Sequence, residues 1–283
     1  GLTIRMAFTI GNQRYTVGVI ISTYNNPKWL EKVFWGYMNQ QLPADEIVVA
    51  DDGSKDDTRE LIEKYKEYLP IKHVWQPDAG FQKSRILNKA IAVSTADYLI
   101  FTDQDCIPMP NFIAVHCRYA QKGYFLSGGY FKLPMELSLA LTKDNVESGD
   151  AFRLGWLKEH GLKCSFKCTK LIKCNTFKWL MNHITPTKAT WNGCNASGWR
   201  ENVLAVNGFN EEMHYGGQDR EFGERMWNSG LKSKQIRYSA IALHLDHKRP
   251  YKTPETLAKN IGIRKDTIRR KVIRTPYGIE KSV

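Results

Sequence analysis

The 283-residue sequence lacks several features that would define its class at once. No apolar run approaches the roughly 20 residues that a membrane-spanning helix needs, so we expect no membrane span. The first residues, GLTIRMAFTI, place no charged segment before an apolar stretch, and we expect no secretory signal. No nucleic-acid-binding motif occurs in a fitting structural context. These absences favour a cytoplasmic globular protein with no nucleic-acid partner.

Cysteine is present, but its spacing excludes the common zinc fingers. Cys164, Cys168 and Cys174 form a C-x3-C-x5-C pattern, with Cys194 or His160 as a conceivable fourth zinc ligand. This spacing fits no common finger, and we therefore favour structural thiols over zinc. An even count of six cysteines does not imply disulfides in a chain of this length without a signal peptide.

The net charge of +12 is concentrated in two segments. Residues 158–188 hold seven Lys and one Glu, and residues 245–283 hold eleven Lys or Arg and four Asp or Glu. Such segments suit anionic lipid, phosphorylated substrates or nucleic acid. The first, which holds a single acidic residue, suits an anionic ligand. The second is either a peripheral contact with the inner membrane face or a solvated helix packed on the domain.

The first half of the chain alternates buried-strand patterns with helical patterns. Helix starts are expected at Asn25-Asn26-Pro27 and Asp56-Asp57-Thr58, followed by a third helix over 84–93. The alternation predicts an α/β fold, with a mostly parallel central sheet and helices on both faces. The expected strands span residues 17–23, 46–50, 71–75 and 98–102.

Three polar clusters follow these strands, at the edge where ligands bind to parallel sheets. They are Ser22-Thr23, Asp51-Asp52 and Asp103-Gln104-Asp105. In an extended backbone, Asp103 and Asp105 face one point while Gln104 faces away. Two neighbouring carboxylates that share a divalent cation, Mg²⁺ or Mn²⁺, are suited to binding a substrate phosphate. The sequence therefore predicts a metal and phosphate site at this edge.

The pattern loosens after Leu133 and becomes regular again near residue 191. A helix is expected after Gly216-Gly217, a strand over 236–245, and a basic helix from Thr253 with an apolar stripe. We expect four parts: an α/β half over 1–130, a variable Lys- and Cys-rich insertion over 131–190, a second ordered part over 191–247, and a basic tail over 248–283. The expected stripe consists of Leu257, Ile261, Ile268 and Val272.

Six short motifs follow one another along the chain: Ser22-Thr23-Tyr24-Asn25, Asp51-Asp52-Gly53-Ser54, Gly80 with Arg85 and Asn88, Asp103-Gln104-Asp105, Gly193–Ser197 with Val206–Phe209, and Gly216–Asp219. In this order they resemble those of inverting family 2 glycosyltransferases with the GT-A fold, over roughly residues 16–130 and 190–247. The later motifs are most similar to bacterial surface-polysaccharide and lipopolysaccharide-core transferases related to β-1,4-galactosyltransferases.

The resemblance implies a role for each part of the chain. Residues 1–130 would form the nucleotide-sugar-binding half, and residues 191–247 the catalytic and acceptor half of the same GT-A domain. The insertion over 131–190, with its Lys-rich segment 158–188, is a candidate acceptor-binding region for a phosphorylated or acidic glycan.

The resemblance implies a hexosyltransferase that uses a nucleotide-sugar donor, usually UDP-linked. It implies that Asp52 accepts from the base or the ribose and that Thr23, Tyr24 and Asn25 lie along the nucleotide. Arg85 is expected to approach the base or the pyrophosphate. A surface charge on a helix is the alternative interpretation of Arg85.

The resemblance also implies a divalent cation, Mn²⁺ or Mg²⁺. Asp105 is expected as its direct ligand, and Asp103 as a contact to ribose or an outer ligand. A late His often completes this site in the family. We expect His244, slightly ahead of His247, and an imidazole ligand would favour Mn²⁺ over Mg²⁺.

Asp219 is implied as the general base that takes a proton from the acceptor hydroxyl. Most relatives have Glu-Asp where this chain has Gln218-Asp219, which places acceptor hydrogen bonding by Gln218 in question. Trp191 is expected to stack on an acceptor sugar, although aromatic residues are more often in the core. The implied acceptor is a glycan or a lipid-linked glycan of the cell surface.

Two other functions fit parts of the pattern. A catalytically degenerate GT-A scaffold would bind a nucleotide or sugar without transfer, but the retained carboxylates argue against it. A nucleotidyltransferase would need a Gly-rich phosphate loop with a basic residue after the first strand, and residues 22–25 supply none.

Overall fold

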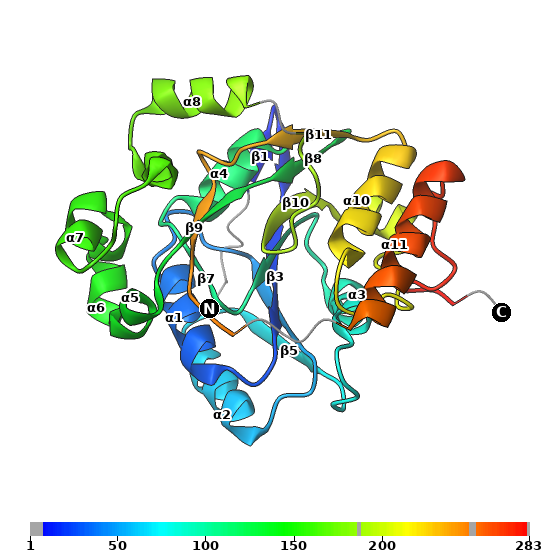
Figure 1. Ribbon diagram of the computed structural model, residues 1–283, viewed down its shortest axis with the longest axis horizontal. Coiled ribbons are helices and arrows are strands. Elements are labelled where there is room, and N and C mark those ends of the chain that lie inside the picture. The colour runs from blue at the N-terminus through cyan, green and yellow to red at the C-terminus, as the bar shows by residue number, and fades with distance from the viewer. Residues whose placement is uncertain (1–7, 186–187, 249–252, 282–283) are drawn as a thin grey trace.

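A seven-stranded sheet forms the centre of the protein (Figure 1). The computed structural model describes residues 8–185, 188–248 and 253–281, so parts of the predicted 1–130, 131–190 and 248–283 ranges lie outside the described residues. Every strand of this sheet runs in the same direction except β10. The order is β11 (Lys232–Gln235), β8 (Tyr124–Ser127), β10 (Asn195–Trp199), β6 (Tyr98–Asp103), β3 (Val17–Thr23), β4 (Glu46–Asp51) and β5 (Ile71–Trp75).

Helices cover both faces of this sheet, as the sequence predicts. Side chains of β3 alternate between two cores, with Val19 and Ile21 in one and Ile20 in the other. The first core includes residues of α1 (Pro27–Met38), α2 (Asp56–Tyr65) and α4 (Phe112–Tyr119). The second core includes residues of α3 (Lys83–Val93), α9 (Arg200–Ala205) and α10 (Gln218–Asn228).

The predicted helix starts are confirmed where a cap could be recognised. Asn26 caps α1 by accepting from Trp29 N at 3.3 Å, and Pro27 occupies the first turn. Thr253 caps α11 (Pro254–Arg269) in the same way, accepting from Thr256 N at 3.2 Å. A side-chain acceptor at the cap satisfies one of the free N–H groups of the first turn.

A second, three-stranded sheet lies beside the first. It consists of β7 (Cys106–Pro108), β12 (Ile241–His244) and β9 (Gly129–Lys132), and a hairpin of β1 (Phe8–Ile10) and β2 (Gln13–Tyr15) precedes β3. The strand predicted over 236–245 is therefore confirmed only for residues 241–244, because residues 236–240 form a turn. The chain leaves the central sheet after β11 and turns before β12 joins the small sheet.

The segment between β9 and β10 consists of short helices, which agrees with the loosened sequence pattern. In Figure 1, α8 lies at the upper left, away from the central sheet. The helices are α5 (Met135–Ala140), α6 (Lys143–Glu147), η1 (Asp150–Phe152), α7 (Leu154–Glu159), η2 (Phe166–Leu171) and α8 (Asn175–Ile184).

The C-terminal helix α11 packs on α10, but two members of its expected apolar stripe face solvent and a third, Val272, follows the end of the helix. Asn260 and Thr267 are its buried residues, whereas Ile261 and Ile268 are 48% and 54% exposed. The Asn260 amide donates to Gly216 O at 2.6 Å, which ties α11 to the loop before α10. Within the described residues, no helix is long and apolar enough to cross a membrane.

Candidate active site

The predicted site motifs meet at one edge of the central sheet. Ser22 of β3 pairs with Asp103 of β6, and Thr23 pairs with Asp51 of β4. Because β10 runs antiparallel to β6, its first residue, Asn195, lies opposite Thr102. The carboxyl ends of three parallel strands and the start of β10 therefore lie side by side.

Asp52 is nearly buried and already hydrogen-bonded on both oxygens. Its Oδ1 accepts from Gln76 Nε2 at 2.7 Å, and its Oδ2 accepts from Gln82 N at 2.9 Å. Burial raises the pKa of Asp52, although these hydrogen bonds oppose the rise. Gly53 has a φ of +100°, and a Cβ there would lie 2.6 Å from the Asp78 backbone. Glycine thus allows this loop to pack closely against residue 78.

The end of β3 and the loop after it are hydrogen-bonded to the loops that follow β6 and β4. Gln104 Oε1 accepts from Thr23 Oγ1 at 2.6 Å and from Tyr24 N at 3.0 Å. Asn25 N donates to Ser54 Oγ at 2.9 Å, and Asn25 Oδ1 accepts from Lys55 N at 2.8 Å. Gln104 therefore positions the Thr23-Tyr24 backbone, a role that the sequence did not indicate.

Strand β6 ends at Asp103, the first of the two carboxylates. Gln104 and Asp105 lie in the turn that follows. The expectation of one shared point, which assumed an extended backbone through Asp105, is corrected because the two carboxylates contact different partners. Asp103 Oδ1 accepts from Ser22 Oγ at 2.7 Å and from Lys83 Nζ at 2.8 Å.

Lys83 is a site residue that sequence reasoning missed. Burial alone would lower the pKa of Lys83, but the charges of Asp103 and then Asp219 raise it overall. Its side chain is 17% exposed. Its position within the Gly80–Asn88 motif is the one sequence feature that points to Lys83, but the motif itself assigns the donor contact to Arg85. Arg85 is exposed on α3, so the structure leaves its predicted donor contact untested.

Asp105 lies between His244 and His247. His247 Nε2 is 3.0 Å and His244 Nε2 is 3.7 Å from Asp105 Oδ2. Strand β12 places them there, because His244 pairs with Cys106 of β7 and Leu245 N donates to Asp105 O at 2.8 Å. Strand β12 ends at His244, so His247 lies beyond the strand and can turn toward the same carboxylate.

These three side chains could hold a divalent cation. Their ligand atoms all lie within 4.8 Å of one another. One carboxylate and two imidazoles form a donor set that suits Mn²⁺ better than Mg²⁺. The hydrogen bond to Asp105 raises the pKa of His247 to about 9. Burial opposes ionisation of Asp105, but His247 and His244 lower its pKa overall. The Asp103 carboxylate is not part of this group.

Asp219 is the second residue of α10, and the helix follows Gly216 and Gly217, whose φ angles are +109° and +83°. A Cβ on Gly193 would lie 2.2 Å from Asp219 Oδ2, so glycine leaves room for the carboxylate. Its Oδ1 is buried with no hydrogen-bond partner among the described residues. Burial raises the pKa of Asp219, while Lys83 opposes the rise. A desolvated carboxylate of raised pKa suits a general base.

The two predicted acceptor residues have different positions. Trp191 is 1% exposed and packs against Phe101, Phe125 and Phe222, so its predicted stacking on an acceptor sugar is wrong. Gln218 Oε1 accepts from Gly216 N at 2.9 Å and so stabilises its own loop. The acceptor contact of Gln218 stays a prediction.

A buried ion pair connects α10 to the Val206–Phe209 motif. Arg225 Nε donates to both Glu221 oxygens, at 2.7 and 2.8 Å. The guanidinium also donates to Val206 O and to Gly208 O, at 2.5 and 2.7 Å. This network fixes the helix that carries Asp219, and much of the motif is therefore structural.

His116 connects β10 to α4 inside the core. Its Nδ1 lies 2.6 Å from Ser197 Oγ and its Nε2 lies 2.7 Å from Asn195 Oδ1. Asn195 Nδ2 donates in turn to Gly129 O and Ala240 O, at 2.8 and 3.0 Å. The Gly193–Ser197 motif thus joins the two sheets, and no sequence signal pointed to His116.

The cysteines form no metal group among the described residues, where the Asp105 cluster is the only candidate. Cys164 and Cys168 lie 3.0 Å apart through their sulfur atoms. Cys106 and Cys117 are buried, whereas Cys174 is exposed. The preference for thiols over zinc stays an interpretation that this arrangement favours.

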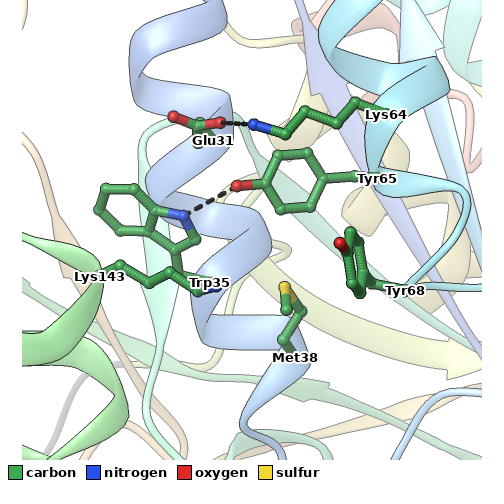
Figure 2. Close-up of a pocket in the computed structure, with 7 residues that line it drawn as sticks. All are labelled: Glu31, Trp35, Met38, Lys64, Tyr65, Tyr68 and Lys143. Carbon is green, nitrogen blue, oxygen red and sulfur yellow. Dashed lines mark hydrogen bonds and ion pairs between the residues drawn. The ribbon is translucent and has the colours of Figure 1, made fainter.

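A pocket elsewhere on the surface does not belong to this site. It lies between α1 and α2, where Trp35 Nε1 donates to Tyr65 OH at 3.0 Å and Lys64 approaches Glu31 (Figure 2). None of its lining residues is a predicted site residue. The candidate site is therefore defined by the convergence of carboxylates at the sheet edge.

Comparison with known proteins agrees with this geometry. The model of the family "Glycosyl transferase family 2" matches residues 18–175, more than half of the chain. The model "N-terminal domain of galactosyltransferase" matches residues 182–248. The sequence is 28% identical to the chondroitin synthase of Escherichia coli over 87% of this chain, and 27% identical to the validoxylamine A glucosyltransferase of Streptomyces hygroscopicus subsp. limoneus over 76%. The chain spans only 37% and 48% of those proteins.

Solved structures with similar folds are GT-A transferases. One is the mannosyltransferase PcManGT from Pyrobaculum calidifontis, with a TM-score of 0.58 and 20% identity over 85% of this chain and 59% of that chain. Another is S. aureus TarS 1-349, with a TM-score of 0.60 and 14% identity over 91% of this chain and 70% of that chain. The strand order, the motif positions and the family match agree: the chain belongs to glycosyl transferase family 2 and has the GT-A fold.

Proposed function

We propose that the protein is a metal-dependent inverting glycosyltransferase that moves a sugar from a nucleotide-sugar, UDP-linked by preference, to a hydroxyl of a surface glycan or lipid-linked glycan. The observation that carries this proposal is the meeting of Asp105, Lys83 and Asp219 at one sheet edge. A catalytically degenerate scaffold would not need a buried, unpartnered carboxylate oxygen at Asp219.

The donor lies along the ends of β3, β4 and β6 in this proposal. Asp52 meets the base or ribose, and the Thr23–Asn25 segment lines the nucleotide. Support for this class of donor comes from the similar folds, since PcManGT was solved with GDP-Man and Mn²⁺ and TarS with UDP-GlcNAc. Asp103 contacts ribose or supports the diphosphate through Lys83, whose Nζ is 2.8 Å away.

Asp105, His244 and His247 would hold the cation, with His247 as well placed as His244. A bound Mn²⁺ would offset the negative charge that builds on the nucleoside diphosphate as it leaves. Lys83 supplies a fixed positive charge in the same region. Its partners Asp103 and Asp219 keep it protonated, because both charges raise its pKa.

Asp219 acts as the base in transfer. The acceptor hydroxyl loses its proton to the carboxylate as its oxygen bonds to the anomeric carbon, and the bond from that carbon to the diphosphate breaks. Attack opposite the leaving group inverts the anomeric centre, as in other inverting reactions with one carboxylate base. Gln218, next to the base, hydrogen-bonds the acceptor.

The acceptor and cellular location belong to the same proposal. The seven lysines between residues 158 and 188 suit a phosphorylated or acidic glycan. Helix α11 turns Ile261 and Ile268 outward beside Lys265, a pattern suited to peripheral contact with the inner membrane face. Vesicle binding that is unchanged in I261S/I268S would remove α11 from this role.

Calorimetric titration with UDP, with and without Mn²⁺, tests the donor and cation sites. We expect Mn²⁺-dependent UDP binding to wild type, and its loss in Asp105→Ala. Asp144→Ala removes an exposed carboxylate on α6 and serves as the matched control, which should bind as wild type does. If neither UDP nor GDP, CMP or dTDP binds in a metal-dependent way, the scaffold function replaces this proposal.

A further inference from the structure

Helix α8 exposes large apolar side chains that the site does not explain. Trp179, Leu180 and Ile184 are 55%, 44% and 59% exposed, and no residue of this helix is buried. Helical spacing places these three side chains and His183 on one outward face. Exposed apolar residues in a group, unlike scattered ones, mark an interaction surface.

The opposite face of α8 is firmly attached, so the helix is held with its apolar face outward. Asn182 Nδ2 donates to Ser239 Oγ at 2.9 Å, and Asn182 Oδ1 accepts from Tyr238 N at 2.9 Å. Gln235 Nε2 donates to Asn182 O at 2.8 Å, and Phe177 packs edge-on against Tyr238. The contacts orient the helix with respect to β11 and β12.

The segment that leads into α8 adds positive charge close to this helix in the sequence. Lys163, Lys167 and Lys173 are exposed, and Glu159 is the only acidic residue between 158 and 188. Phe166, on η2 before α8, is 73% exposed and adds a further aromatic ring. The segment therefore combines outward aromatic and aliphatic side chains with a net charge of one sign.

We propose that α8 and its adjoining lysines dock the protein on the surface of an anionic lipid bilayer. Interfacial helices of this kind insert Trp, Leu and Ile between headgroups while Lys contacts anionic lipid. A polyanionic glycan or nucleic acid would pair with the lysines but leave Leu180 and Ile184 in water. A second copy would bring two strongly basic segments together, and like charge opposes that contact.

This surface lies outside the donor and cation site and is distinct from α11, although its lysines fall within the 158–188 segment proposed above for an acidic acceptor. Its test therefore fails or succeeds separately from the proposed transfer activity, because UDP binding in solution does not involve α8. Membrane docking through α8 would place the enzyme next to any lipid-linked acceptor.

Co-sedimentation with vesicles tests the proposal. Wild type should bind vesicles of mixed phosphatidylglycerol and phosphatidylcholine at low salt, and bind pure phosphatidylcholine vesicles weakly. The variant Trp179→Ser/Leu180→Ser/Ile184→Ser should partition about tenfold less well or worse. Lys163→Gln/Lys167→Gln/Lys173→Gln should lose the salt-sensitive part of binding.

Two controls make the result decisive. Val93→Ser removes an apolar side chain that is 43% exposed on α3 and should bind vesicles as wild type does. Retained Mn²⁺-dependent UDP binding, or an unchanged circular dichroism spectrum, shows that the α8 variant is folded. Equal vesicle binding by wild type and the α8 variant overturns the proposal. So does a lipid-free dimer of wild type that the α8 variant converts to monomer.

Discussion

The central sheet and helix α8 use apolar residues in opposite ways. Strand β4 is buried along its whole length, whereas α8 has no buried residue. Long-range polar contacts reinforce the sheet region, such as Arg225 to Val206 and His116 to Asn195. The contrast agrees with the two proposals, in which the sheet positions the reacting groups and α8 docks on a lipid surface.

Asparagine at Asp219 should produce the largest effect, because it removes the proposed base but keeps the size of the side chain. We expect Asp219→Asn to lower kcat by about 10²- to 10⁴-fold while leaving UDP affinity close to wild type. Transfer from the nucleotide-sugar that proves to bind gives the measurement. Near-normal transfer would show that another group takes the proton.

Methionine at Arg225 should strongly destabilise the fold, because it leaves Glu221 buried without its partner. The expected loss is about 3–5 kcal/mol of unfolding free energy by urea denaturation. Arg153→Met breaks an ion pair with Asp150 in the insertion, where the arginine is 55% exposed. That control should cost less than about 1 kcal/mol. If both variants lost a similar amount of unfolding free energy, the two regions would not differ in how much their ion pairs stabilise the fold.

Lowering the pH should lower the free energy of unfolding, because His116 is buried in the sheet region in its neutral form. Burial lowers the pKa of this imidazole to about 4, from 6.5 for an ordinary His. The unfolded state therefore binds more protons than the folded state between these values, and stability is lost as pH falls from about 6.5 to about 4. The loss reaches about 3 kcal/mol. Urea denaturation across this range should show a shallower pH dependence in His116→Gln.

Removing the charge of Lys83 should shift the acid limb of the activity profile. Burial raises the pKa of Asp219 and Lys83 opposes this rise, so Lys83→Met should raise that pKa further. A base is inactive when protonated, and the fall in kcat/KM should therefore begin at a higher pH in the variant. The variant Lys83→Arg should restore the wild-type limb. An unshifted limb in the methionine variant would contradict electrostatic coupling of the two residues.

The smallest effect is expected for the stability of an α8 variant. Trp179→Ser/Leu180→Ser should change the unfolding free energy by less than about 0.5 kcal/mol, because both side chains are exposed. Urea denaturation measures this directly. A loss of several kcal/mol would mean that the outward face is covered in solution.

The sequence predicted correctly those helices and strands whose local residue pattern matches their burial in the fold. Continuous apolar runs identify β3, β4 and β6, and Asn26 and Thr253 mark helix starts through their caps. Family motifs placed Asp105 and Asp219, and the sheet then brought them to one edge. Family membership and the GT-A fold are confirmed, while the individual residue roles stay predictions.

Other features depend on contacts that no local pattern encodes. Lys83 matters because α3 places its amine 2.8 Å from Asp103 Oδ1. Trp191 was expected at the acceptor, but a ring surrounded by three Phe rings is a core residue. Helix α11 buries Asn260 in preference to Ile261 and Ile268, because the Asn260 amide donates to backbone carbonyls of the Gly216 loop. At each of these positions, contacts with residues distant in the sequence determine the role of the side chain, and its residue type alone does not.

Strand β10 also has a consequence for how the protein is made. It lies between β6 and β8, although nearly seventy residues separate it in sequence from β8. Until residues 195–199 leave the ribosome, β6 has an unpaired edge that invites pairing with other chains. The central sheet therefore cannot be completed before β10 has been synthesised. A fragment that ends before residue 195 should aggregate, and the donor half should not fold as an independent module.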